Sequence, residues 1–260
     1  MSALILSTVL GIILLYLGLT KKKSILAPVA IAGLLGTLYL TIGGWGLEAT
    51  YFHDMVLFDN FSIAFNASMI IITVLIFFFG IDYYKMMELH VADQYALVIF
   101  ALVGAFLMTS FSNLIMLFLG IEILSIPLYV LAGGKKSSYR SNEASFKYFM
   151  LGSFATTIFL FGIALVYGAS ATFYLPEIKA YIAQFNGNLP PMLLVGLLFI
   201  VIGVAFKVAV APFHFWSPDV YEGSPTLITA FMATVVKTAG FAAFYRLLTI
   251  GLLPMPVPIE

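Results

Sequence analysis

The sequence alternates long apolar runs with short polar segments, and the runs have the length of membrane-crossing helices. The hydrocarbon core of a bilayer needs about 20 apolar residues in helical conformation. We expect eight such helices, over residues 3–19, 25–45, 61–81, 94–110, 114–132, 144–167, 192–216 and 225–248. The pattern predicts an all-α fold, a polytopic transmembrane bundle of about eight spans.

The polar segments between these runs add two local predictions. The turn Phe111-Ser112-Asn113 is so short that the helices on either side of it must be antiparallel neighbours. Residues 175–185, LPEIKAYIAQF, have the pattern of a short amphipathic surface helix with Pro176 near its start. Residues 46–60 are expected to form a polar loop.

The distribution of basic residues predicts the orientation of the helices. Inner loops of membrane proteins carry an excess of Lys and Arg. With the N-terminus outside, eight of the twelve basic residues fall in inner loops, whereas the outer loops hold only Lys179 and Arg246. The charges at residues 21–23 follow the first apolar run, which is the reverse of a signal peptide. We therefore expect the N-terminus outside.

Composition excludes several classes of function. The chain is 62% hydrophobic and 9% charged, against about 25% charged residues in soluble domains. Its net charge is zero, which gives no electrostatic basis for binding nucleic acid. Cysteine is absent, so thiolate-held iron–sulfur clusters and disulfides are excluded, and three scattered histidines argue against bis-histidine haem. We expect this chain to act through protons, ions or contacts with other molecules. We expect no cofactor in it.

The run over residues 192–216 is expected to be a broken helix. Lys207 lies deep inside it, where an ionisable group costs about 2.5–3.5 kcal/mol. Pro212 removes a backbone donor and frees the carbonyl of Val208, so the helix should kink or break there. A lysine beside a helix break is typical of hydrated polar sites at mid-depth. The alternative is a lysine that extends to the membrane surface along its flexible stem.

Two further charges fall near the middle of apolar runs. Glu122 lies in LIMLFLGIEILSIPLYVL, five residues before Pro127, and Pro127 should loosen that helix. Lys237 lies near the centre of the last run. A carboxylate near Lys207 favours its protonated form, while burial and a second lysine disfavour it, so the three groups could form a gated proton relay. The alternative is a static buried ion pair between Glu122 and one lysine.

Three other residues are weaker candidates for supporting roles. His214, just past the break, could pass protons or cap the loose end of the helix. Thr234 could line a water path, although threonines in membrane helices usually hydrogen-bond to their own backbone. Lys147, near the inner side, could be a proton acceptor or an anchor.

Three stretches carry a resemblance to a known family. FLGIEILSIPLYVLAG, EASFKYFMLGSFATTIFLFGIALVYG and FKVAVAPFHFWSPDVYEGSPTLITAFMATVVKTAGF resemble the antiporter-like subunits of proton-pumping NADH:quinone oxidoreductase, respiratory complex I. The second stretch is most similar to the subunit N branch. The resemblance covers essentially the whole chain. It implies that Glu122, Lys207 and Lys237 match the glutamate and two lysines of the family's proton relay.

The resemblance also implies an organisation and a setting. Residues 1–90 would be the three N-terminal helices, 91–250 the antiporter-like repeat, and 251–260 a truncated loop, with the family's second repeat missing. A translocase subunit without redox chemistry of its own is implied, with other membrane subunits and the lipid bilayer as partners. Quinone and NADH would bind in other subunits. The implied location is the bacterial inner (plasma) membrane.

Two other functions stay open at this point. The same motifs occur in subunits of multi-subunit sodium/proton antiporters and membrane-bound hydrogenases. A structural scaffold that moves no ions is the third possibility, and neutralising Glu122 and Lys207 would distinguish it. The ion moved and its stoichiometry are not encoded in these motifs.

Overall fold

The chain folds into an all-α bundle. The structure, a computed structural model, describes residues 1–20, 23–85, 91–185 and 188–252. Its α-helices are α1 (Ser2–Gly18), α2 (Leu26–Ile42), α3 (Asn60–Lys85), α4 (Val91–Ser110), α5 (Leu114–Ala132), α6 (Tyr139–Ser170), α7 (Leu175–Ala183), α8 (Pro191–Val208), α9 (Ser217–Gly223), α10 (Thr226–Phe231) and α11 (Lys237–Arg246). A short 3-10 turn, η1 (Lys23–Ile25), precedes α2.

The described helices confirm a polytopic membrane bundle of about eight spans. Six helical segments of the described chain are long and apolar enough to cross a bilayer, the last being the continuous segment Thr226–Ile250. Two shorter apolar helices, α1 and α2, have 17 residues each. Together these segments correspond to the eight expected runs.

The last span is helical throughout but not uniformly α-helical. Two π-helical segments, η2 (Met232–Val236) and η3 (Leu247–Leu252), lie on either side of α11. Residues 251 and 252 are thus helical and not part of a loop, while residues 253–260 lie outside the described part of the chain. π-helical turns inside α-helices are often found at functional sites.

The segment expected as a polar loop contains a small hairpin. Strands β1 (Ala49–Tyr51) and β2 (Val56–Phe58) pair antiparallel, with Thr50 opposite Leu57. The polar loop expected over residues 46–60 therefore includes two short strands that the sequence did not predict. The amphipathic helix predicted over 175–185 is confirmed as α7, with Pro176 in its first turn.

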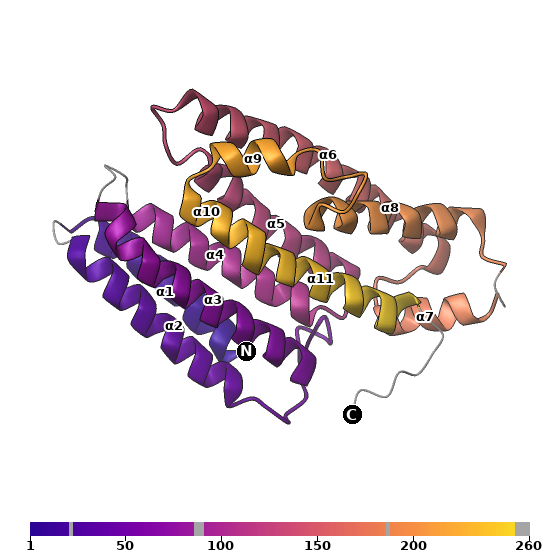
Figure 1. The fold of residues 1–260 in the computed structure, drawn as a ribbon. Helices are drawn as coiled ribbons and strands as arrows, with labels where there is room; N and C mark the ends of the chain where they lie inside the picture. Colours follow the sequence, from indigo (N-terminus) through magenta and orange to yellow (C-terminus); the bar gives the residue numbers. More distant parts are fainter. Residues whose placement is uncertain (21–22, 86–90, 186–187, 253–260) are drawn as a thin grey trace.

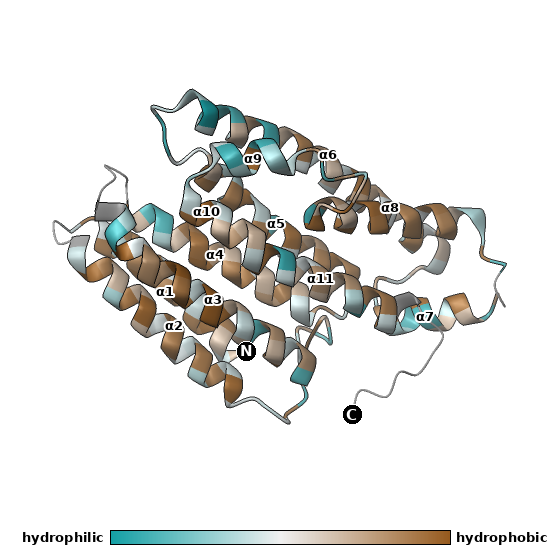
Figure 2. Cartoon of the chain, in the orientation of Figure 1, coloured by the Kyte–Doolittle hydropathy of each residue, from teal (hydrophilic) through white to brown (hydrophobic). Residues whose placement is uncertain are grey.

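The helices form a layered bundle, with α4 and α5 in the middle (Figure 1). α1, α2 and α3 lie on one side of this central pair, and α6, α8 and α9 lie on the other. The segment from α10 to α11 crosses the face of the central helices. Hydrophilic residues gather at the start of α6, on α9 and on α7, while the long helices are mainly hydrophobic (Figure 2).

Glycines set the distances between the central helices. A Cβ on Gly104 of α4 would lie 2.3 Å from the amide nitrogen of Leu124 on α5, so only glycine allows this approach. Gly162 on α6 and Gly196 on α8 meet in the same way, because a Cβ on Gly162 would lie 2.8 Å from the Gly196 carbonyl. Small residues at such crossings let the backbones of membrane helices approach closely, which increases their packing contacts.

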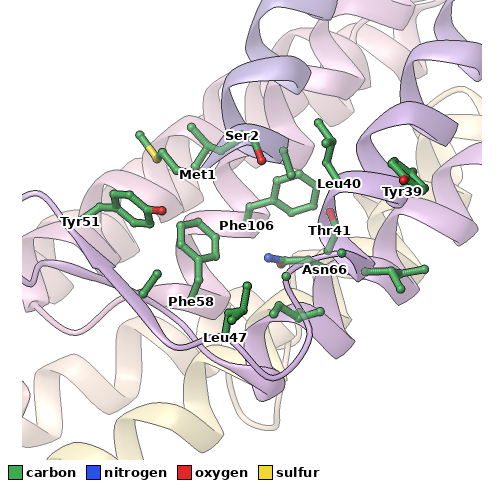
Figure 3. Close-up of a pocket in the computed structure, with 17 residues that line it drawn as sticks. Met1, Ser2, Tyr39, Leu40, Thr41, Leu47, Tyr51, Phe58, Asn66 and Phe106 are labelled. Atoms are coloured by element: carbon green, nitrogen blue, oxygen red, sulfur yellow. The ribbon is translucent and has the colours of Figure 1, made fainter.

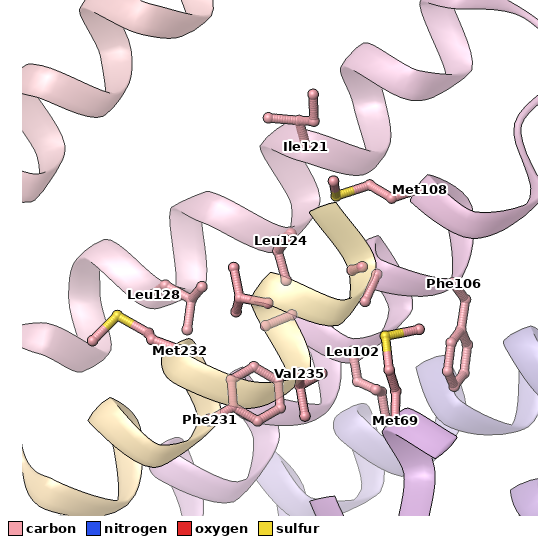
Figure 4. Packing of buried hydrophobic residues seen from close by; sticks show 14 of the residues in the cluster. Met69, Leu102, Phe106, Met108, Ile121, Leu124, Leu128, Phe231, Met232 and Val235 are labelled. Atoms are coloured by element: carbon pink, nitrogen blue, oxygen red, sulfur yellow. The ribbon is translucent and has the colours of Figure 1, made fainter. Parts of the chain in front are cut away.

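Part of the hydrophobic core is formed by the first half of the last span. Phe231, Met232 and Val235 insert between α4 and α5, against residues such as Leu102 and Leu128 (Figure 4). All five side chains are at most 1% exposed. This packing holds the helix that carries Lys237 against the centre of the bundle.

A candidate proton site at a broken helix

The helix that carries Lys207 ends directly after it. α8 stops at Val208, and its C-cap Ala209 has a left-handed backbone with φ 56°. From there the chain runs without α-helix until α9. Pro212 has no amide proton, and in a continued helix its ring would clash with the carbonyl of Val208. The interruption predicted between about Val208 and His214 is confirmed, so the apolar run to residue 216 is not one helix.

The Lys207 side chain points into the bundle. The residue is 5% exposed, and its Nζ lies 2.7 Å from Oγ of Ser125 on α5 and 3.4 Å from the hydroxyl of Tyr148 on α6. Tyr148 is itself 1% exposed. The alternative of a lysine extending to the membrane surface is therefore wrong.

Lys237, the first residue of α11, contacts the same end of α8. Its Nζ lies 3.4 Å from the backbone carbonyl oxygen of Lys207 and 5.0 Å from the ring centroid of Trp216. The indole nitrogen of Trp216 donates to the carbonyl of Phe206 at 3.1 Å. The last carbonyls of a helix have no partner within it and carry partial negative charge. Two side chains, one of them cationic, thus satisfy the open end of α8.

Glu122 lies close to this site without an ion pair. It stands one turn before Ser125 on α5, whose hydroxyl contacts Lys207. The ion pairs found in the described part of the chain do not include Glu122, and its Oε1 is buried without a hydrogen-bond partner. The static ion pair considered above is not the arrangement seen. α5 continues as a helix through Pro127.

A small cavity lies beside Lys207. Its volume is about 10 Å³, roughly the 10–15 Å³ that one water molecule needs. The lining combines hydroxyl-bearing and apolar side chains from α5, α6 and α8, among them Ser125, Tyr129, Tyr148, Phe159 and Lys207. The site has room for about one water next to the lysine.

Lys147 belongs to a polar cluster at the start of α6. Its Nζ lies 2.6 Å from Oδ2 of Asp219 on α9 and 2.8 Å from Oε1 of Glu143. A second, exposed pair joins Arg140 to Glu222 at 3.3 Å. These groups line a polar cleft of about 180 Å³. Lys147 therefore ties the short helix after the break to α6, and the following residue, Tyr148, contacts Lys207.

Three remaining supporting candidates, Pro212, His214 and Thr234, are exposed. His214 and Pro212 are exposed in the segment between α8 and α9. The hydroxyl of Thr234 is exposed and donates to the carbonyl of Ala230 in its own helix at 2.6 Å. The structure does not bring these side chains into contact with Lys207. Their supporting roles stay predictions.

Sequence reasoning missed three residues that hold the lysines. Ser125 and Tyr148 contact the ammonium of Lys207, and Trp216 stacks on Tyr148 with ring centroids 4.9 Å apart. Ser125 could have been found, because it lies one turn from Glu122 on the same helix face. Nothing in the local sequence distinguishes Tyr148 from the other aromatic residues of the chain.

The structure corrects the placement of Arg246 in the count of basic residues. It was counted in an outer loop, but it ends α11 and is 1% exposed. Its Nη2 lies 2.5 Å from Oδ1 of Asp59, and its guanidinium lies 5.2 Å from the ring centroid of Phe61. The same Oδ1 accepts the amide of Ser62 at 2.8 Å, at the start of α3. A basic residue at the end of an apolar run resembles a loop residue until its partner is known.

A buried lysine and a half-buried lysine at the end of a membrane helix define the class, an integral membrane protein with ionisable groups inside its bundle. Such groups usually mark ion or proton pathways. The family described as NADH:quinone oxidoreductase/Mrp antiporter, TM, matches residues 111–255, and the chain belongs to this family.

Individual relatives agree with this assignment. The chain is 45% identical over 249 residues to NADH-quinone oxidoreductase subunit N of Cytophaga hutchinsonii, covering 95% of this chain and 53% of the relative. A chain of respiratory complex I from Thermus thermophilus, solved with bound aureothin, superimposes with a TM-score of 0.79 at 32% identity. That match covers 94% of this chain and 52% of the solved one.

A second solved structure supports the fold alone. A chain of the Mrp complex from Dietzia sp. DQ12-45-1b gives a TM-score of 0.75 at 20% identity, over 96% of this chain and 49% of that one. The chain thus spans about half the length of the relatives that it matches.

Proposed function

We propose that the chain is a proton-translocating membrane subunit of an NADH:quinone oxidoreductase, in which Glu122, Lys207 and Lys237 pass protons. The observation that carries the proposal is Lys207, buried with two hydroxyls around its ammonium. A hydroxyl can donate or accept a hydrogen bond. Lys207 can therefore keep hydrogen-bond partners as an ammonium and as a neutral amine, which is what a stored and released proton requires.

Lys237 supplies a competing charge at the same place. Its ammonium is attracted to the open end of α8, whose carbonyls carry partial negative charge. A second positive charge nearby disfavours the protonated form of Lys207. Protonation of one lysine thus opposes protonation of the other. A proton that arrives at one lysine therefore favours release of the proton from the other.

Glu122 is the group that changes this balance. A charged carboxylate near an ammonium favours the ammonium form, and protonation of that carboxylate would remove the support. A buried carboxylate oxygen without a partner is costly, by about 1–3 kcal/mol or more. A water or a proton at Oε1 would remove this cost, so Glu122 is suited to act as a gate.

The proposal includes a setting for the whole protein. We assign it to the bacterial inner membrane with the N-terminus outside, so that Lys147 and its cluster lie on the cytoplasmic side. Other membrane subunits of the same complex are its partners. Binding of NADH and quinone is assigned to those subunits, and this chain takes no cofactor. The names of the subunit N relatives support the assignment to this kind of complex.

The test compares three side chains at position 122. In vesicles that hold the assembled complex, Glu122→Gln should lower proton uptake per quinone reduced sharply, because the charge is lost while volume and hydrogen-bonding reach are kept. Glu122→Asp should have a milder effect, because the charge remains. Glu48→Gln, at an exposed carboxylate between α2 and β1, is the matched control. Unchanged pumping in a correctly assembled Glu122→Gln complex would show that this carboxylate is structural.

A second function is favoured by the fold shared with the Mrp chain. The chain would then be a subunit of a multi-subunit sodium/proton antiporter, or of a membrane-bound hydrogenase with the same motifs. Purification of the complex separates these functions, because flavin and iron–sulfur subunits accompany only a redox complex. A scaffold without transport would keep full activity when Glu122 and Lys207 are both neutralised.

A further inference from the structure

A larger cavity lies between α1, α2 and the β1–β2 hairpin. Its volume is about 500 Å³, within the roughly 300–1,000 Å³ of pockets that hold small molecules. The lining is mainly apolar, with Leu40, Leu47, Phe58 and Phe106 around its centre (Figure 3). None of the charged residues of the proton site lines it.

Asn66 is one of the polar side chains that line this mainly apolar space, together with Ser2, Tyr39, Thr41 and Tyr51. Asn66 on α3 is 3% exposed, and its Oδ1 accepts from the hydroxyl of Thr109 at 2.6 Å. That hydroxyl also lies 2.9 Å from the carbonyl oxygen of Phe106, so its proton is shared. The amide nitrogen of Asn66 points into the cavity and has no hydrogen-bond partner in the described part of the chain (Figure 3). A donor in an apolar space favours a ligand that brings an acceptor.

The surroundings place the cavity at the membrane–water interface. Tyr39 and Tyr51 line it and are 79% and 37% exposed, and Trp45, beside it in sequence, is 59% exposed. Tyr and Trp gather where membrane proteins meet the lipid headgroups. In a phospholipid, ester carbonyls separate the headgroup from the acyl chains at about this depth. A carbonyl oxygen and an alkyl chain are the two features that the cavity can bind.

We propose that this cavity binds a membrane phospholipid, with one acyl chain in the apolar part. In this arrangement an ester carbonyl oxygen of the lipid accepts a hydrogen bond from the amide nitrogen of Asn66. The apolar lining gives affinity for the chain, and Asn66 fixes its depth. The inference is independent of proton transfer, because it uses no residue of the relay.

The experiment measures labelling by a photoreactive phospholipid. The protein, in its assembled membrane complex, is placed in nanodiscs of a diether phospholipid, with a trace of a diester phosphatidylethanolamine that carries a diazirine on one acyl chain. After illumination, labelled peptides from residues 39–66 are quantified. Asn66→Leu should lower this labelling by about three- to tenfold, as expected for one lost hydrogen bond. A diether analogue, which lacks the carbonyl, should lower it similarly with the unmodified protein.

Two substitutions on α2 test the location. Leu40→Trp should fill the cavity and lower labelling, whereas Leu35→Trp, at an exposed position outside it, should not. Equal labelling by the diester and diether lipids would overturn the proposal even if Asn66→Leu failed to fold. Competition is the last test. If an excess of a short-chain quinone lowers labelling but an excess of unlabelled phospholipid does not, the proposal is overturned and the cavity is assigned to a quinone.

Discussion

The first two helices and the region around the broken helix satisfy their buried polar groups in different ways. In α1 and α2, three buried hydroxyls donate to the carbonyl four residues earlier in the same helix, those of Ser7, Thr37 and Thr41. Around the break, Lys207, Trp216 and Lys237 donate to groups outside their own helices. A helix that bonds to itself can move without breaking polar contacts, whereas the broken region can move only by exchanging partners.

The largest functional effect is expected at the centre of the broken region. Lys207→Leu should abolish proton uptake while the protein still assembles, because Lys207 forms no ion pair in the described part of the chain and its loss leaves no bonded carboxylate without a counter-charge. The measurement is proton uptake in vesicles, normalised to assembled protein. Lys136→Leu, in the exposed segment before α6, is the control. Normal uptake in the Lys207 variant would remove this residue from the relay.

The largest stability effect is expected at Asp59. Asp59→Ala leaves Arg246 buried without a counter-charge, which typically costs about 3–5 kcal/mol. Breaking the exposed Arg140 pair by Glu222→Ala should cost about 0–1 kcal/mol. Denaturant unfolding in detergent, followed by circular dichroism, compares the two variants. If both cost under 1 kcal/mol, Arg246 has another partner.

A smaller effect is expected where side chains bond across helices. Ser125→Ala removes the 2.7 Å contact of the buried Lys207 ammonium and should cost about 1–3 kcal/mol. Tyr148→Phe should cost less, because its contact is 3.4 Å long. The same unfolding measurement on both variants and their combination gives the coupling between the contacts. Fully additive costs would argue against one shared network.

The smallest effect is expected in the self-bonded helices. Thr37→Val removes a hydroxyl that only contacts Gly33 in its own helix, and the shape is nearly kept. We expect a change within about 0.5 kcal/mol in the unfolding measurement. If Thr37→Val costs as much as Ser125→Ala, then hydrogen bonds within one helix and hydrogen bonds between helices contribute equally to stability, and the contrast between the two regions fails.

The helices could be predicted from the sequence because apolar length alone determines what can cross a bilayer. The break could be predicted as well, because Pro212 is incompatible with a continuous helix whatever surrounds it. The expectation that Lys207 faces the interior also follows from the cost of exposing an ammonium to lipid, and its low exposure agrees. The division into residues 1–90, 91–250 and 251–260 stays a prediction.

The missed features depend on neighbours that are far apart in the sequence. Ser125 and Lys207 are separated by 82 positions, and Asp59 and Arg246 by 187. No local pattern identifies such partners, because each side chain is ordinary where it stands. The hairpin over residues 49–58 was missed for another reason, since its strands have three residues each and show no clear alternation.

One oxygen atom belongs to the ends of two helices. Oδ1 of Asp59 accepts both the Ser62 amide that begins α3 and the guanidinium that ends α11. The two helix ends are therefore anchored at a common point, some distance along α11 from Lys237. With that end fixed, α11 cannot slide as a whole, so a rearrangement of Lys237 has to be absorbed by its side chain or by the π-helical turn η2 directly before it. The shared carboxylate thus limits the directions of motion open to the last span.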